Sequence, residues 1–167
     1  MTGFADGLLQ PLSVPTHFMA AAALALLIGQ QRWGPRVAAV YVVAILMGLG
    51  AIALAYVPTL AQEGLLAASA AAGLLVAVAR PLPHSVGALL AGAAGLALAL
   101  DSPPGAISLR DANLALLGTA IGAAIVLVVL VQVTSRLSRA WQRIGARIVG
   151  SWIAASAILV LALRLGS

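Results

Sequence analysis

Few side chains in this 167-residue sequence could do chemistry, and the most promising ones lie near the starts of apolar segments. His17 follows Gln10 and Thr16, and Glu63 opens a later apolar run. An imidazole suits nickel, cobalt, zinc or copper, and it also suits a proton site. The alternative is a histidine at a membrane boundary that is hydrogen-bonded to a carbonyl group. Glu63 also has two interpretations, because a carboxylate is favourable at any helix N-terminus.

These side chains form none of the familiar catalytic patterns. The sequence has no cysteine, and it contains no P-loop, dinucleotide fingerprint, zincin helix or Ser/His/Asp set. The second histidine, His84, follows Pro83 in a short connection near Arg80 and suits a loop residue. We therefore predict that the protein is not an enzyme. A transported divalent metal ion is the one candidate ligand, and no resident cofactor is expected.

Composition excludes a water-soluble globule. Hydrophobic residues make up 63% of the chain and charged residues 8%, whereas a soluble domain has about 45–50% and about 25%. Mean hydropathy is +1.13. All nine basic residues are arginines near the ends of apolar runs or in one short linker, which argues against nucleic-acid binding despite the net charge of +5. We therefore predict that the lipid bilayer surrounds the protein.

Six membrane-spanning helices in one domain, residues 1–167, are predicted to position the candidate residues. A helix needs roughly 20 apolar residues to cross about 30 Å of hydrocarbon, and the abundance of Ala and Leu favours helix over strand. An apolar stretch at 7–14 ends at Pro15 and predicts a short re-entrant segment before the first span. Residues 101–105 are predicted to form a plain loop. The spans are 16–30, 37–57, 62–79, 85–100, 112–133 and 147–163.

The distribution of arginine predicts the orientation of a compact six-helix bundle. Seven arginines fall on one side of the predicted topology, while Arg110 and Arg164 fall on the other. The seven-arginine side is predicted to face the cytoplasm of a bacterium, with a multi-pass inner-membrane location and both termini periplasmic. The first twelve residues carry Asp6 and no basic residue, which does not predict a cleavable signal peptide. The seven arginines are Arg32, Arg36, Arg80, Arg136, Arg139, Arg143 and Arg147.

The last cytoplasmic connection, at about 134–146, is predicted to be an amphipathic linker at the membrane interface. Four arginines repeat at steps of three, four and four residues, beside an apolar face that includes Trp141. Arginine at anionic headgroups and tryptophan at headgroup level would anchor such a segment. A docking site for a lipid or protein partner is the alternative. The predicted anchor residues are Arg136, Arg139, Trp141, Arg143 and Arg147.

Small residues predict close helix packing. Gly118 and Gly122 form a GxxxG pattern, and Gly87, Ala91 and Gly95 repeat every four residues on the fourth span. Such faces let helices approach closely in lipid. Packing within the chain is the expected role, and contact with a second copy is the alternative.

The order of these features resembles the HupE/UreJ family, whose members are six-span proteins associated with hydrogenase and urease gene clusters. The family opens with His-Pro-x-x-Gly-x-Asp-His, and residues 10–17 keep this spacing with Pro11 and His17 in place. Residues 62–75 are similar to the family's third span, where Glu63 and Ser69 match its pattern, and residues 147–155 are similar to its last span. The resemblance covers nearly the whole chain and implies import of nickel or cobalt.

The chain departs from this pattern at most of the family's metal-ligand positions. Gln10 and Thr16 replace a histidine and an aspartate of the first signature. The second signature, His-Gly-x-Ala-His-Gly-x-Glu, falls on residues 91–98, which keep Gly92 and Ala94 but neither histidine nor the glutamate. The resemblance therefore implies a divergent member. Its metal site would consist of His17 and Glu63, with Gln10 at the position of the lost histidine.

Two functions are compatible with these observations. The first is import of nickel or a similar divalent cation, entering from the external side past Gln10, His17 and Glu63. The second is a non-transporting accessory or scaffold subunit of a larger membrane complex. The two hypotheses differ in what covers the small-residue face of the fourth span. If lipid covers it, a partner helix or a second copy is expected there, whereas burial within the chain removes the main support for a scaffold.

Overall fold

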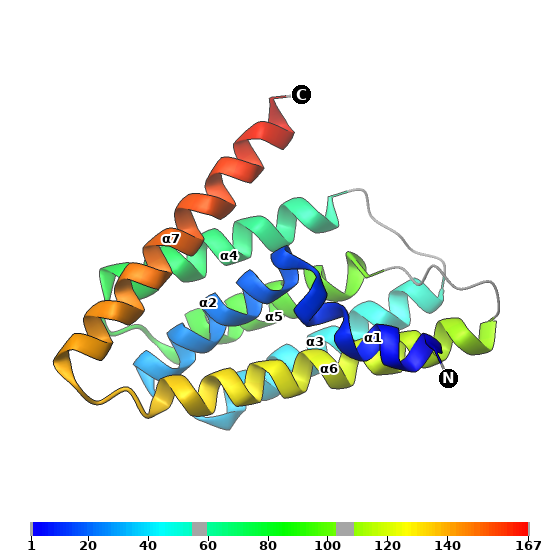
Figure 1. The fold of residues 1–167 in the computed structure, drawn as a ribbon, viewed down its shortest axis with the longest axis horizontal. Helices are drawn as coiled ribbons and strands as arrows, with labels where there is room; N and C mark the ends of the chain where they lie inside the picture. The colour runs from blue at the N-terminus through cyan, green and yellow to red at the C-terminus, as the bar shows by residue number, and fades with distance from the viewer. Residues whose placement is uncertain (1, 55–59, 103–108, 167) are drawn as a thin grey trace.

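A computed structural model describes residues 2–54, 60–102 and 109–166 (Figure 1). Within these ranges the chain is all-helical, with seven helices and no strand. The last three residues of the predicted second span, 55–57, and residues 103–105 of the predicted loop lie outside the described ranges. The helices are α1 (Thr2–Ser13), α2 (Pro15–Gln31), α3 (Pro35–Ala53), α4 (Ala61–Val78), α5 (His84–Leu100), α6 (Leu109–Ser135) and α7 (Ala140–Leu165).

Proline and glycine mark several of the observed helix boundaries. Pro15 and Pro35 are the first residues of α2 and α3, where the missing N–H costs no helical hydrogen bond. Gly34, just before α3, has a φ of 72°, a left-handed conformation that glycine adopts without steric cost. Helices α2 and α4 instead end on left-handed residues with a Cβ, Arg32 and Ala79.

The first two helices form one bent unit. They meet at Val14 at an angle of 63°, because Val14 is extended and Pro15 restarts the helix. This geometry is that of a broken span or a re-entrant loop. The predicted segment at 7–14 is therefore the second half of a longer helix, α1, that begins at Thr2.

Length and composition identify four helices that could cross a membrane: α3, α4, α6 and α7. The bent pair α1–α2 adds a fifth if it is counted as one span. Helix α5 is apolar but has 17 residues, so it falls at the short end of the range for a spanning helix. The structure thus shows four to five candidate spans, and the count of six remains a prediction.

The connection between α6 and α7 is shorter than the sequence indicates. Helix α6 continues to Ser135 and α7 begins at Ala140, so most of the predicted linker at 134–146 forms the first turns of the last helix. The side chain of Gln142 explains this start. Its Oε1 accepts hydrogen bonds from the backbone N–H of Ser138 at 3.2 Å and of Arg139 at 3.0 Å, which satisfies groups that a helix start leaves unpaired.

Helix α2 lies at the centre of the bundle, against α1, α4, α5, α6 and α7. Its alanine-rich surface is almost wholly buried, including Ala21, Ala23 and Ala25, so neighbouring helices can approach it from several sides. The remaining helices pair mainly as α1 with α6, α3 with α5 and α4 with α7. Helix α7 packs chiefly on α4, and this contact continues into its C-terminal half, where Ala157 is buried against Leu66 and Ala70.

The small residues predicted for packing are all in contact within the chain. A Cβ at Gly118 or Gly122 would come within 3.0 Å of backbone atoms of α1. On α5, a Cβ at Gly87 would meet the ring of Trp33, and one at Gly95 would meet the backbone of Tyr41. Ala91 is fully buried. The small-residue face of α5 is therefore covered by α3 and the turn before it.

Candidate functional site

His17 is the most completely buried polar residue that the sequence singled out. It lies in the first turn of α2, just after the bend at Val14, and has no exposed surface. Its Nε2 atom is 3.0 Å from Oδ2 of Asp101, the residue that ends α5. The Asp101 side chain keeps about a fifth of its surface exposed (20%), so the pair lies at the edge of the packed interior.

Asp101 was predicted to lie in a plain loop, and its contact with His17 was not predicted. The two partners are separated by 84 residues, and local patterns carry no information about such a contact. One signal was present: Asp101 directly follows an apolar span and was predicted on the same side of the membrane as His17. An acidic group at that position is a natural partner for a histidine one turn inside a helix.

The other ring nitrogen of His17 has no partner. Among the described residues, His17 Nδ1 is buried and makes no hydrogen bond, and Thr16 Oγ1 is in the same state. Histidines that bind metals commonly donate one ring N–H to a carboxylate, which fixes the tautomer and leaves the other nitrogen free to coordinate. The Asp101–His17 pair has this arrangement, with Nδ1 as the free nitrogen.

Gln10 is hydrogen-bonded to a different helix. Its Oε1 accepts a hydrogen bond from Oγ1 of Thr119 on α6 at 2.9 Å. The contact ties α1 to α6 beside the close approach at Gly118. Gln10 thus helps to hold the bent α1–α2 unit in place, and the structure shows no hydrogen bond between it and His17.

Glu63 has a partner of its own. Its Oε1 lies 3.7 Å from Nη1 of Arg164, near the end of α7, and its Oε2 is buried without a hydrogen bond. The pair joins the start of α4 to the end of α7. In the described ranges no group of three or more His, Asp or Glu side chains could hold a metal ion. The structure therefore does not gather His17, Asp101 and Glu63 into one complete ligand set.

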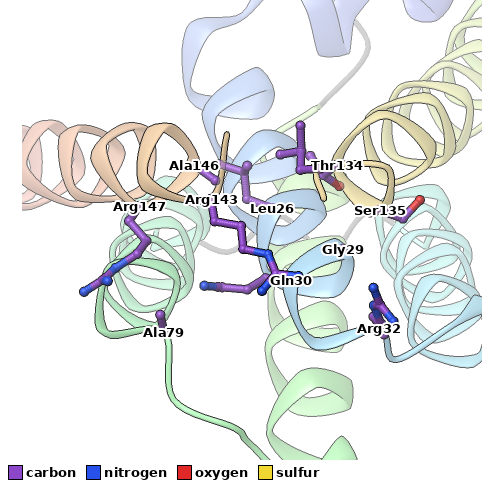
Figure 2. A pocket seen from close by; sticks show the side chains of 11 residues that line it. Leu26, Gly29, Gln30, Arg32, Ala79, Thr134, Ser135, Arg143, Ala146 and Arg147 are labelled. Atoms are coloured by element: carbon purple, nitrogen blue, oxygen red, sulfur yellow. The ribbon is translucent and has the colours of Figure 1, made fainter. Parts of the chain in front are cut away.

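The opposite end of the bundle carries arginines around a cavity of about 450 Å³ (Figure 2). The cavity lies where α2, α4 and α6 end and α7 begins. Arg32, Arg143 and Arg147 line it. Of the other predicted interface anchors, Arg136 and Arg139 are exposed, and Trp141 has 65% of its surface exposed. These side chains could reach the headgroup region of a bilayer.

The fold and composition define a multi-pass α-helical membrane protein. The family model described as HupE / UreJ protein matches residues 1–160, so the chain belongs to this family and the resemblance seen in the sequence is confirmed. No curated protein and no solved structure gives a significant match. The family is a membrane accessory and transport family that is not known for enzymatic activity, and membership suggests a nickel or cobalt accessory or transport role.

Proposed function

We propose that the protein imports nickel or a similar divalent cation across the inner membrane of a bacterium, with His17 as its first ligand. The observation that carries this proposal is the buried imidazole whose Nε2 is held by Asp101, while Nδ1 has no partner among the residues that the structure describes. A neutral imidazole nitrogen binds nickel, cobalt, copper and zinc well. Family membership supplies the second line of support.

In this proposal α2 to α7 cross the membrane and both termini lie outside. Polar and charged groups at the two ends of the bundle support this topology. His17 meets Asp101 at one end, and Glu63 meets Arg164 there as well. The turns at 32–34, 79–83 and 136–139 lie at the other end (Figure 1). Those turns contain or adjoin most of the arginines, which favours that end for the cytoplasm.

The residues at the outer end have separate roles in the proposed entry of a cation. Asp101 orients His17 by accepting a hydrogen bond from Nε2, and it adds negative charge to a partly dry site. Thr16 Oγ1, which is also buried without a hydrogen bond among the described residues, is a candidate oxygen ligand. Glu63 lies at the same end, but Arg164 offsets its charge, so it has a smaller part than His17 in this proposal. Gln10 fixes α1 against α6 through Thr119.

A site with few protein ligands is suited to transit. A permeating ion must bind well enough to enter and weakly enough to leave. One imidazole nitrogen with hydroxyl and water oxygens meets this requirement better than a closed four-ligand site, which retains its metal. The absent histidines of the family's second signature therefore weaken binding without removing the entry site.

The test is metal-dependent thermal stabilisation of the purified protein. Nickel should raise the unfolding temperature of the wild type, because a ligand that binds only the folded state stabilises it. His17→Ala should abolish the shift, and Asp101→Asn should weaken metal affinity about 10–100-fold. His84→Ala is the matched control, since His84 lies at the arginine-rich end beside Trp33.

Two results would overturn the proposal. One is the absence of any shift with Ni²⁺, Co²⁺, Zn²⁺ and Cu²⁺. The other is a shift in His17→Ala that equals the shift in the wild type. Uptake of radioactive nickel by cells that express each variant then separates transport from binding alone.

An accessory subunit is the second candidate, and the exposed face of α7 favours it. Trp152 has 70% of its surface exposed, and Leu159 has 62%. The main sequence argument for a scaffold is lost, however, because α3 and its preceding turn cover the small-residue face of α5. Purification in mild detergent should yield a stoichiometric partner that Trp152→Ser releases. Repeated isolation of the protein alone would count against this candidate.

A further inference from the structure

The arginine-lined cavity has the chemistry of a site for a phosphate group. Arg32, Arg143 and Arg147 line a space of about 450 Å³, and among the described residues no acidic side chain lines it. Figure 2 shows the Arg143 side chain extending toward Gln30, Arg147 directed away over α4, and Arg32 apart from both near the end of α2. The planar guanidinium fork matches phosphate oxygens in pairs of hydrogen bonds.

Two of the three arginines have unused hydrogen-bonding capacity. Arg147 Nε donates to the Ala77 carbonyl at 2.9 Å, which fixes that side chain to the end of α4. The side chains of Arg32 and Arg143 make no hydrogen bond or ion pair with the described residues. The C-termini of α2, α4 and α6 attract cations to this end through their partial negative charge. Because no described group accepts a hydrogen bond from Arg32 or Arg143, the donors of both side chains are available to an anion.

A second cavity lies next to the first. It has a volume of about 480 Å³ and shares Gly29, Arg32 and Ser135 with the arginine-lined cavity. Between α2, α3 and α6 its lining becomes mainly apolar, with side chains such as Ile28 and Val131. The arginine-lined cavity thus lies beside an apolar groove, the second cavity. This pair matches a molecule with an anionic head and a hydrocarbon tail.

We propose that these two neighbouring cavities, which share Arg32, together bind one anionic phospholipid. Its phosphate lies between Arg143 and Arg32, and one acyl chain follows the apolar groove past Val131. Free phosphate shares the headgroup chemistry, but it would leave the groove empty, so the groove favours the lipid. The site does not depend on metal transport. The proposed topology places it in the cytoplasmic leaflet, where anionic lipids attract basic residues.

Native mass spectrometry of the full chain tests the assignment. The protein is equilibrated in detergent with dioleoyl phosphatidylglycerol or dioleoyl phosphatidylcholine, and retained lipid is counted. We expect phosphatidylglycerol to bind at least about tenfold more tightly. Both lipids carry the phosphate, but the choline ammonium of phosphatidylcholine cancels its charge and is repelled by Arg32 and Arg143. Arg143→Gln and Arg32→Gln should each lose about the same factor. Arg136→Gln is the matched control, since Arg136 is exposed and lines neither cavity.

Three outcomes would overturn the proposal. Equal retention of both lipids would show that the headgroup charge is not recognised. An equal loss in Arg136→Gln would show a diffuse effect of net charge. Displacement of the lipid by inorganic phosphate at a similar concentration would show that the groove contributes nothing and that the ligand is free phosphate. Arg143→Lys keeps the positive charge but loses the paired hydrogen bonds of a guanidinium group. If those bonds hold the phosphate, Arg143→Lys should bind phosphatidylglycerol less tightly than the wild type and more tightly than Arg143→Gln.

Discussion

Replacement of Gly118 by alanine should loosen the bent α1–α2 unit that carries His17. Helix α6 presents Gly118 to α1, where a Cβ would lie within 3.0 Å of the Phe4 carbonyl oxygen and the Leu8 nitrogen. Both are backbone atoms, so no side chain can rotate away. The two helices must separate, which also stretches the adjacent hydrogen bond between Gln10 and Thr119 at 2.9 Å.

The magnitude follows from two opposing effects. Alanine in place of glycine stabilises a helix by up to about 1 kcal/mol, while forced overpacking costs about 1–3 kcal/mol. Gly145→Ala isolates the first effect, because a Cβ at Gly145 in α7 meets nothing within 4 Å. The free energy of unfolding of Gly118→Ala should therefore lie about 1–3 kcal/mol below that of Gly145→Ala.

Reversible unfolding in mixed dodecyl maltoside and SDS micelles, followed by circular dichroism, measures both variants under one condition. If Gly118→Ala also loses the rise in unfolding temperature that nickel gives the wild type, then α1 positions the entry site. If Gly118→Ala is as stable as Gly145→Ala, then α1 does not pack on α6 as the structure shows, and the reasoning fails.

Three further substitutions probe single contacts. Thr134→Val removes the hydrogen bond from Oγ1 to the Ala25 carbonyl at 2.8 Å and should cost about 1 kcal/mol in the same unfolding titration; an unchanged midpoint would contradict it. Gln31→Leu removes contacts to the Arg80 carbonyl at 2.6 Å and the Leu82 N–H at 3.1 Å. It should cost about 1–3 kcal/mol and speed proteolysis between α4 and α5. Glu63→Gln breaks a partly exposed pair and should cost less than about 1 kcal/mol, with a far smaller effect on the nickel shift than His17→Ala.

The starts of several helices could be predicted from the sequence because local chemistry determines them. Pro15 and Pro35 cannot continue a preceding helix but fit the first turn of the next one, and the observed starts fall within two residues of the predicted ones. The observed start of α7, at Ala140, lies seven residues before the predicted start at 147. The prediction assumed that the arginines lie outside the helix, but Arg143 and Arg147 are good helix formers. The helix therefore includes both and begins where Gln142 caps it.

Helix partners could not be predicted in the same way. The spans are apolar around most of their surface, so periodicity does not indicate which face meets which neighbour. The glycine patterns on α5 and α6 did identify close approaches, yet the partners, α3 and α1, came only from the structure. The same holds for the candidate site. His17 could be predicted from its residue type and position, but its partner Asp101 could not, because 84 residues separate the two in the sequence.

The two ends of α2 impose conflicting requirements on a cation that crosses the bundle. An ion that enters at His17 and leaves near Gln30 would meet Arg32 and Arg143, whose positive charges oppose its exit. A bound anionic phospholipid would neutralise part of that barrier. If both proposals hold, nickel flux in liposomes should fall when phosphatidylglycerol is replaced by phosphatidylcholine, and Arg143→Gln should restore much of it. Lipid-independent flux that Arg143→Gln leaves unchanged would instead place the exit between other helices.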